Sequence, residues 1–135
     1  MSQSFHKLYY HVIWTTKDRQ PIISSFVEAL LKEVIPKTIQ KYGGLYFVFN
    51  AVDDHVHLLT SIPPKISISE FVNKIKGSSS HHINISQNEK SFYWQSGFGI
   101  LSLSEKGIPF VKQYIKNQKQ HHKNNRNLIN ILESC

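Results

Sequence analysis

Two spacings of hydrophobic residues alternate along the chain, and they predict strands and helices in a definite order. Runs rich in Val, Ile, Phe and Tyr predict strands at residues 6–16, 45–52, 55–62 and 98–104. Apolar residues three or four positions apart predict a helix at 25–42, and a second that starts at 67 and either frays near Gly77 or continues to about 85. A third helix is predicted from residue 104 to about 124, because that segment has no glycine or proline after its first turn.

This order of elements predicts an α+β fold. The succession βαββαβ is that of a ferredoxin-like split βαβ sandwich with a four-stranded antiparallel sheet, and the third helix follows it at the C-terminal side. The chain has 135 residues, of which 40% are hydrophobic, enough for one core. We therefore expect residues 1–135 to form a single domain.

The first two predicted helices carry specific local features. Phe26, Leu30 and Val34 are expected to form the apolar side of the first helix, which should kink at Pro36. The second helix begins with the spacing of a capping box, in which the hydroxyl of Ser67 accepts from the backbone of a residue three positions later.

The last predicted helix has a basic side and an opposite side with different chemistry. Ser104 is a candidate cap for it, and Pro109 suits a first helical turn. At 100° per residue, four lysines fall within about 60° of arc. These are Lys112, Lys116, Lys119 and Lys123. Tyr114 and Gln118 lie one turn apart on the other side.

Composition adds a charge and a compartment to this prediction. The 16 Lys and Arg residues exceed the 9 Asp and Glu residues to give a net charge of +7, which favours a polyanionic partner such as nucleic acid. The single cysteine, Cys135, provides neither a disulfide framework nor a cysteine-rich zinc site. No apolar run has the length of a membrane span, and the first residues lack the pattern of a signal peptide. We expect a cytoplasmic protein without membrane contact.

The motif at residues 53–59 is the most informative in the chain. On a strand, His55 and His57 project from the same face while Val56 points the other way, and this spacing can chelate a metal ion. Asp53 and Asp54 supply the turn before the strand. The alternative is that both histidines simply lie on a half-buried strand, because a two-residue motif needs structural context.

Tyr114 and Gln118 allow a similar choice between two interpretations. Tyr114 can be an aromatic anchor that packs the helix on the sheet, with the lysines as a solvated outer side. Alternatively, a tyrosine and an amide on the side that meets the sheet can complete a metal and nucleophile site with His55 and His57. His121 and His122 are rival ligands on the same helix.

Six segments, in order along nearly the whole chain, carry a family resemblance. They are Tyr10-His11-Val12-Ile13-Trp14-Thr15-Thr16-Lys17, Asp54-His55-Val56-His57-Leu58-Leu59, Ser61-Ile62-Pro63-Pro64-Lys65, residues 69–79, Trp94-Gln95-Ser96-Gly97-Phe98 and Tyr114-Ile115-Lys116-Asn117-Gln118. Through these segments the chain resembles the small single-tyrosine HUH transposases of the TnpA insertion-sequence family, with the REP-associated tyrosine transposases related to it.

The resemblance implies a complete catalytic set. His55 and His57 match the histidines that hold a divalent metal, Mg²⁺ or Mn²⁺, and Gln118 matches the third protein ligand. Tyr114 matches the nucleophile, which cleaves single-stranded DNA at hairpin-marked element ends and forms a 5′-phosphotyrosine without ATP. The resemblance also implies a homodimer in which the tyrosine helix of one subunit serves the histidines of the other.

Several further residues are candidates for DNA contacts. We expect phosphate contacts from basic side chains and base stacking from the aromatic run at 92–94. The phosphate candidates are Lys65, Lys74, Lys76 and Lys112, and the main stacking candidate is Trp94, beside Phe92 and Tyr93. The alternative is that the lysines are only solvated and that the aromatic residues fill the core.

Two other functions compete with the transposase. One is a nucleic-acid-binding module without catalysis, which would stack bases on the strand aromatics Tyr46, Phe47 and Phe49. The other is a metal-dependent nuclease that activates water and uses Tyr114 only structurally.

Overall fold

The computed structural model describes residues 5–119, and its strands and helices follow the predicted order. The strands are β1 (Tyr9–Thr15), β2 (Tyr46–Val52), β3 (His55–Ser61) and β4 (Gly99–Leu103). The helices are α1 (Ser25–Lys41), α2 (Ile68–Gln87) and α3 (Ile108–Lys116), with short 3-10 turns η1 (Lys17–Arg19) and η2 (Glu105–Gly107).

The four strands form one antiparallel sheet in the order β2-β3-β1-β4. The two strands of the hairpin are therefore adjacent, and β1 lies between β3 and β4. This is the arrangement of a split βαβ unit, so the predicted ferredoxin-like α+β fold with an additional C-terminal helix is confirmed.

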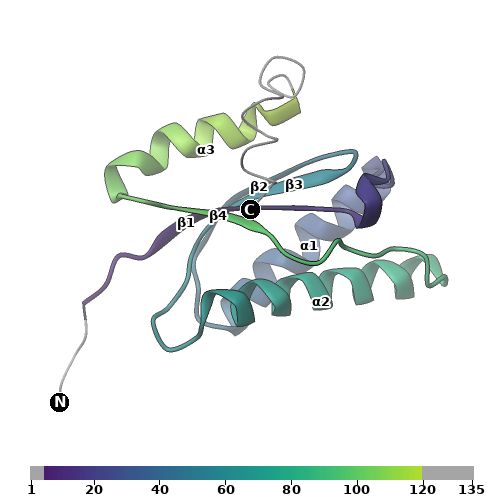
Figure 1. The fold of residues 1–135 in the computed structure, drawn as a ribbon, viewed down its shortest axis with the longest axis horizontal. Coiled ribbons are helices and arrows are strands. Elements are labelled where there is room, and N and C mark those ends of the chain that lie inside the picture. The colour runs from purple at the N-terminus through teal and green to yellow at the C-terminus, as the bar shows by residue number, and fades with distance from the viewer. Residues whose placement is uncertain (1–4, 120–135) are drawn as a thin grey trace.

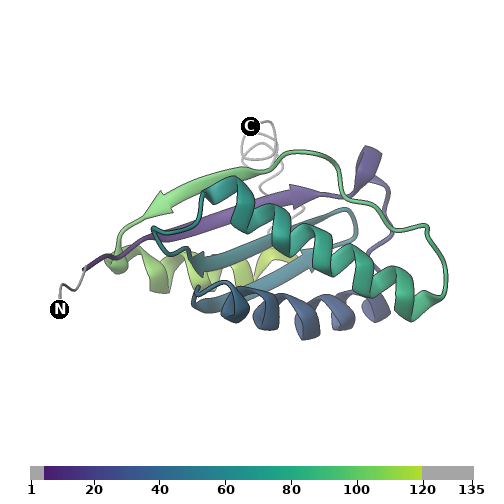
Figure 2. The same ribbon diagram turned by 90° about the horizontal axis from the view of Figure 1, so that it is seen from below.

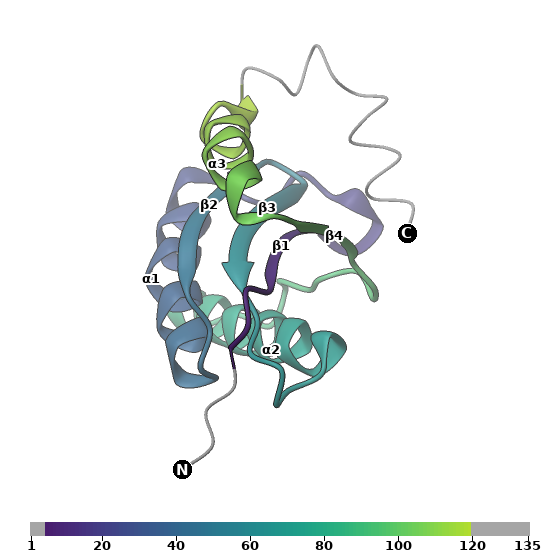
Figure 3. The ribbon, with the colours of Figure 1, turned by 90° about the vertical axis from the view of Figure 1, so that its left-hand side faces the viewer.

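The helices cover the two faces of the sheet unequally. In Figure 1, α1 and α2 lie on one side of the sheet and α3 lies on the other. Figure 2 shows α1 and α2 running side by side across their face. Figure 3 shows α3 above β2 and β3, which are the strands that it contacts, with β4 at the far edge of the sheet. The sheet thus has one fully covered face and one partly covered face.

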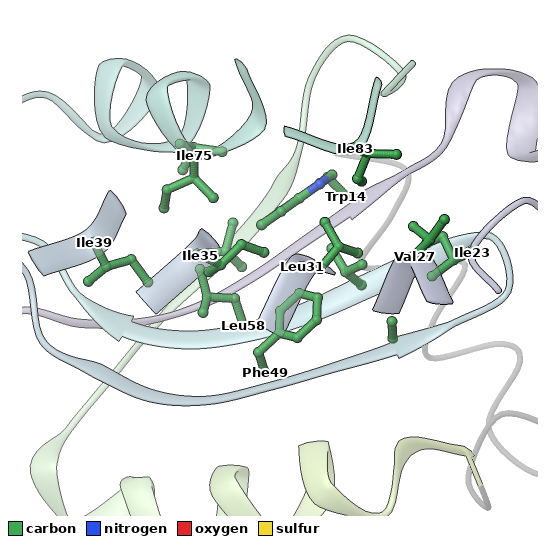
Figure 4. Close-up of a cluster of buried hydrophobic side chains, with 14 of the residues drawn as sticks. Trp14, Ile23, Val27, Leu31, Ile35, Ile39, Phe49, Leu58, Ile75 and Ile83 are labelled. Atoms are coloured by element: carbon green, nitrogen blue, oxygen red, sulfur yellow. The ribbon is translucent and has the colours of Figure 1, made fainter. Parts of the chain in front are cut away.

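The main hydrophobic core fills the space between the sheet and the helices α1 and α2. Alternate strand residues point into it, including Trp14 from β1, Phe49 from β2 and Leu58 from β3, and all three are at most 3% exposed. Figure 4 shows these side chains meeting Leu31 and Ile35 from α1. Each large apolar side chain buried in this way contributes about 1.5–3 kcal/mol, so this layer supplies most of the folding free energy.

The prediction for α1 was wrong about the row of residues that the helix buries. Its buried stripe is Val27, Leu31 and Ile35, one position later than predicted, and Phe26 is 57% exposed. The helix runs through Pro36 as one element to Lys41, and the predicted kink stays a prediction.

Helix α2 is capped as predicted. The Ser67 hydroxyl accepts from the backbone N–H of Glu70 at 3.1 Å. The helix continues through Gly77 to Gln87, and Asn88 ends it in the left-handed conformation (φ 54°). Within residues 5–119, none of the helices combines the length and apolar character needed to cross a lipid bilayer.

Helix α3 is interrupted before its predicted end. It ends at Lys116, with Asn117 as its C-cap, and the Ser104 side chain makes no capping hydrogen bond, because the turn η2 separates it from the helix. Pro109 does lie in the first turn, as expected. Residues 118 and 119 are again helical, and the part of the predicted helix after residue 119 lies outside the described residues, as do His121, His122 and Lys123.

Candidate active site

The histidine pair on β3 lies on the face that α3 covers. Because side chains alternate along a strand, Val56 and Leu58 point into the main core, whereas His55 and His57 point to the opposite side. Both histidines are 0% exposed, and their ring centroids are 5.2 Å apart. The strand therefore presents two imidazoles to one buried space, as their spacing predicted.

A carboxylate orients the first of these histidines. The Asp54 Oδ1 atom lies 2.7 Å from His55 Nδ1, and its Oδ2 atom lies 3.2 Å from Arg19 Nε. Burial raises the pKa of Asp54, but the hydrogen bond from His55 and the charge of Arg19 outweigh it, so the pKa of Asp54 is lowered. An ionised carboxylate accepts a hydrogen bond from the N–H at Nδ1, which leaves Nε2 of His55 as the ring nitrogen that can bind a metal.

A third histidine orients the second. The Nε2 atom of His11, on β1, lies 2.9 Å from Nδ1 of His57. Burial lowers the pKa of His11 to about 4, so the ring is neutral at pH 7. The Nδ1 atom of each histidine of the pair is therefore occupied by another side chain, Asp54 or His11, and the Nε2 atoms of both are buried.

Tyr114 lies over the same group of rings. Its ring meets that of His57 edge-on, with centroids 6.1 Å apart, and that of His11 at 6.2 Å. The side chain also packs against the small cluster of Val48, Leu59 and Ile115 between α3 and the sheet. Tyr114 is thus both an anchor for α3 and a neighbour of the histidines of its own chain, so the two predicted interpretations are compatible.

Asn50 fixes the end of α3 beside the histidine pair. Asn50 is the cross-strand partner of His57, and its Nδ2 atom donates to the carbonyls of Ile115 (2.9 Å) and Lys116 (3.2 Å). Its Oδ1 atom accepts from the ammonium of Lys119 at 3.0 Å. Residues 115–119 are therefore held over β2, at the level of His57.

Gln118 lies inside this anchored segment. It is 0% exposed, and neither its amide nitrogen nor its amide oxygen has a hydrogen-bond partner among residues 5–119. A buried amide without partners is costly, which suggests a role that a bound group would complete. Within residues 5–119 no three His, Cys, Asp or Glu side chains gather around a metal site, so among these residues a third protein ligand for the pair would be of another type.

A comparison of the chain with protein families decides its membership. The model of the family described as "Transposase IS200 like" matches residues 4–118. The chain belongs to the IS200-like transposase family. The match spans the histidine motif, Tyr114 and Gln118.

Individual relatives agree with this assignment. The transposase is 29% identical to the ISDra2 transposase TnpA of Deinococcus radiodurans over 119 residues, which are 84% of this chain and 85% of that protein. It is 24% identical to the transposase for insertion sequence element IS200 of Salmonella typhimurium, over 84% of this chain and 78% of the relative.

Two solved structures share the fold. A transposase structure from Deinococcus radiodurans superimposes with a TM-score of 0.68 at 26% identity, covering 87% of this chain and 96% of the other. The structure of a REP-associated tyrosine transposase bound to a REP hairpin gives 0.64 at 16% identity, covering 90% and 74%. At 16% identity, the second similarity supports only the fold described for this chain.

The lysines predicted to contact DNA fall into two groups. Lys65 and Lys74 are exposed, and Lys112 is partly exposed. Lys76, in contrast, is 7% exposed, and its ammonium donates to the carbonyls of Gln95 and Gly97, each at 2.7 Å. Lys76 therefore holds the loop before β4 in this structure, and its predicted phosphate contact remains untested.

The aromatic residues at 92–94 differ from one another in exposure. Phe92 is 2% exposed and belongs to the core, whereas Tyr93 is 50% exposed. Trp94 is partly buried, lies edge-on to Trp14 at 5.7 Å and donates from Nε1 to Ser79 Oγ at 3.0 Å. Of the three rings, only that of Tyr93 is largely exposed. The alternative that these residues fill the core is correct for Phe92.

The strand aromatics do not form an open platform for bases. Phe49 is 3% exposed beneath α1 and α2, and Phe47 packs under α3 because a register irregularity between Tyr46 and Val48 turns it to that side. This arrangement speaks against a binding module that stacks bases on the sheet.

Three site residues were missed from the sequence: His11, Asp54 as an orienting group, and Asn50. His11 is the one polar side chain in the otherwise apolar run 11–14 of β1, which was a usable signal. Asn50 interrupts β2 in the same way. What each contacts depends on the pairing of strands, which the sequence pattern did not specify.

Proposed function

We propose that this IS200-like transposase cleaves and rejoins single-stranded DNA through a covalent 5′-phosphotyrosine on Tyr114, with a divalent ion held by His55, His57 and Gln118. Membership of the family implies DNA cleavage and strand transfer. The observation that carries the finer proposal is the position of the Tyr114 ring, 6.1 Å from that of His57, on a helix whose last turn is anchored by Asn50, the cross-strand partner of His57.

The donor set suits a divalent ion of the Mg²⁺ or Mn²⁺ type. Two neutral imidazoles and an amide oxygen tolerate Mn²⁺ well and Mg²⁺ adequately, whereas thiolates that would favour Zn²⁺ are missing from the set. The buried, unpartnered amide of Gln118 fits this role, because coordination would satisfy its oxygen. When bound, such an ion polarises the scissile phosphate and stabilises the charge that develops on the leaving oxygen.

Tyr114 is the proposed nucleophile. A neutral phenol is a weak nucleophile, so it needs a polarised phosphate to react. Its oxygen forms a bond to phosphorus, the bond from phosphorus to the 3′ oxygen breaks, and the proton lost by the phenol is balanced by the proton gained by the 3′-hydroxyl. The phosphodiester energy is kept in the adduct, so rejoining to another 3′ end requires no ATP.

The proposed substrate is single-stranded DNA that carries a hairpin. A structure of the same fold has a hairpin bound, which makes such DNA the first substrate to test. The net charge of +7 favours a polyanion, and Lys65, Lys74 and Lys112 are proposed phosphate contacts, whereas Trp94 is a proposed stacking residue. We further propose a homodimer, in which the docked α3 described here can serve its own chain or exchange with the partner.

A labelled DNA hairpin tests the proposal directly. The protein is incubated with Mn²⁺ and DNA labelled at its 3′ end, and the products are separated on a denaturing gel. Because the adduct retains the 5′ phosphate, 3′-labelled DNA should shift to a protein-sized band, whereas 5′-labelled DNA should give a shorter free fragment.

Tyr114→Phe removes only the nucleophilic oxygen, so we expect the band to disappear and cleavage to fall by at least about 10³-fold. Tyr93→Phe is the matched control, since Tyr93 is an exposed tyrosine whose hydroxyl donates to the Lys90 carbonyl, and it should retain activity. Cleavage without any covalent band would instead support the nuclease, and binding without cleavage would support the binding module.

A further inference from the structure

We infer that His11 is a positioning residue of the metal site, which accepts a hydrogen bond from Nδ1 of His57 and thereby keeps the lone pair of that ring on Nε2. The inference rests on the proposed function, because it concerns the site in which His57 would be a ligand. It assigns a role to a histidine outside the motif of residues 53–59.

Strand pairing holds the two rings in place. His11 pairs with Leu59 and Ile13 pairs with His57, so His11 and His57 are diagonal neighbours on one face of β1 and β3. Their ring centroids are 5.1 Å apart, and the Nε2 to Nδ1 distance is 2.9 Å. His11 is 5% exposed and His57 is 0% exposed, so water does not replace this contact readily.

The contact contains one proton, and its position decides what His57 can do. If the proton is on His57 Nδ1, then Nε2 of that ring has a lone pair for a cation, and His11 is the acceptor. If the proton is on His11 Nε2, the lone pair of His57 points away from the site. Coordination requires the first arrangement, in which His11 carries its own proton on Nδ1.

An imidazole is well suited to this position. Asp54 plays the corresponding part for His55, and its carboxylate is also paired with the Arg19 side chain near the surface. His11 lies between β3 and β4 in the middle of the sheet, where an acidic side chain would be a buried charge. A neutral ring accepts the same hydrogen bond without that cost.

Three substitutions separate the acceptor from the shape of the ring. His11→Phe keeps a flat ring beneath Tyr114 but removes the acceptor. His11→Gln places an amide oxygen near the position of Nε2, whereas the shorter side chain of His11→Asn reaches only about as far as Nδ1. Circular dichroism of the three variants, compared with the wild type, shows which of them are folded.

The first measurement is the affinity for Mn²⁺ in the absence of DNA, which the EPR signal of free Mn²⁺ reports. We expect His11→Phe and His11→Asn to weaken binding by about 10–100-fold, the range found when an outer hydrogen-bond partner of a ligand is removed. His11→Gln should bind close to the wild-type affinity. Wild-type affinity in His11→Phe, or equal losses in the Gln and Asn variants, would overturn the inference.

The second measurement needs no metal. In protein labelled with ¹⁵N-histidine, the nitrogen shifts of His57 should show the proton on Nδ1 in the wild type and in His11→Gln, and a shift toward Nε2 protonation in His11→Asn. An unchanged tautomer in His11→Asn contradicts the inference. If the wild type binds no Mn²⁺ and forms no adduct, the proposed function fails, while the tautomer still tests the role of His11.

Discussion

The two faces of the sheet bury side chains of different chemistry. Towards α1 and α2, the strands present Val12, Trp14, Phe49 and Leu58, and the layer is almost entirely apolar. Towards α3, they present polar side chains that are equally buried. These are His11, Asn50, His55 and His57. Burial is therefore favourable for folding on the apolar face. On the polar face it is unfavourable unless a ligand or a reaction uses the buried groups.

Neighbouring residues of β3 show this contrast most clearly. His57 and Leu58 are both 0% exposed, but the polar ring points towards α3 and the apolar side chain points towards α1 and α2. On the α3 side, the buried apolar residues of the described part of the chain are fewer: Ile13 and the cluster of Val48, Leu59 and Ile115. Burying polar groups there reduces stability, and the larger core on the opposite face compensates.

The largest expected effect on stability comes from the apolar face. Leu58→Ala should lower the free energy of unfolding by about 2–5 kcal/mol, because it removes buried methyl groups and leaves a cavity. Urea denaturation of the metal-free protein measures this loss. A loss below about 1 kcal/mol would mean that the core under α1 and α2 is not the main source of stability.

An intermediate effect is expected at the anchor of α3. Asn50→Leu removes two hydrogen bonds to the carbonyls of Ile115 and Lys116 and should cost about 1–3 kcal/mol in urea denaturation, while DNA cleavage falls more than tenfold as Tyr114 loses its position. Asn50→Asp keeps the shape and an acceptor for Lys119 but cannot donate. Wild-type behaviour of Asn50→Asp would show that the donated hydrogen bonds are unimportant.

The smallest effect has the opposite sign. Gln118→Leu replaces a buried amide that has no partner within residues 5–119, so it should raise the stability of the metal-free protein by about 1 kcal/mol. Wild-type protein should gain stability when Mn²⁺ is added, and the variant should lose most of that gain.

The control is Gln113→Leu, on the exposed side of α3, which should change stability by less than about 0.5 kcal/mol and leave the effect of Mn²⁺ intact. If Gln118→Leu destabilises the metal-free protein, then its amide is a structural group and the comparison of the two faces needs revision.

Sequence periodicity predicted the layers of the fold but not every residue within them. In α1, Phe26, Leu30 and Val34 form one apolar row, and Val27, Leu31 and Ile35 form a second row beside it. Both have the spacing of a buried stripe, and only the contact with α2 and the sheet selects the second.

The site was predictable where its geometry is local. The spacing of His55 and His57 implies a shared face on any strand, and that geometry is observed. His11 and Asn50 contact the site only through the register of β1 and β2 against β3, which depends on pairing between distant segments. The break in α3 at Asn117 is also non-local, because that residue type does not forbid a helix and the carbonyls of Ile115 and Lys116 accept from Asn50.

The length of α3 has a consequence for how the transposase is controlled. A helix of nine residues has little stability of its own in water, since nucleation is unfavourable and few backbone bonds follow it. Its order therefore depends on docking to β2 and β3, so leaving the sheet and unwinding are coupled events. The nucleophile is rigidly presented only while the helix is seated, and a released segment would expose an unstructured, poorly aligned phenol instead of a competent one.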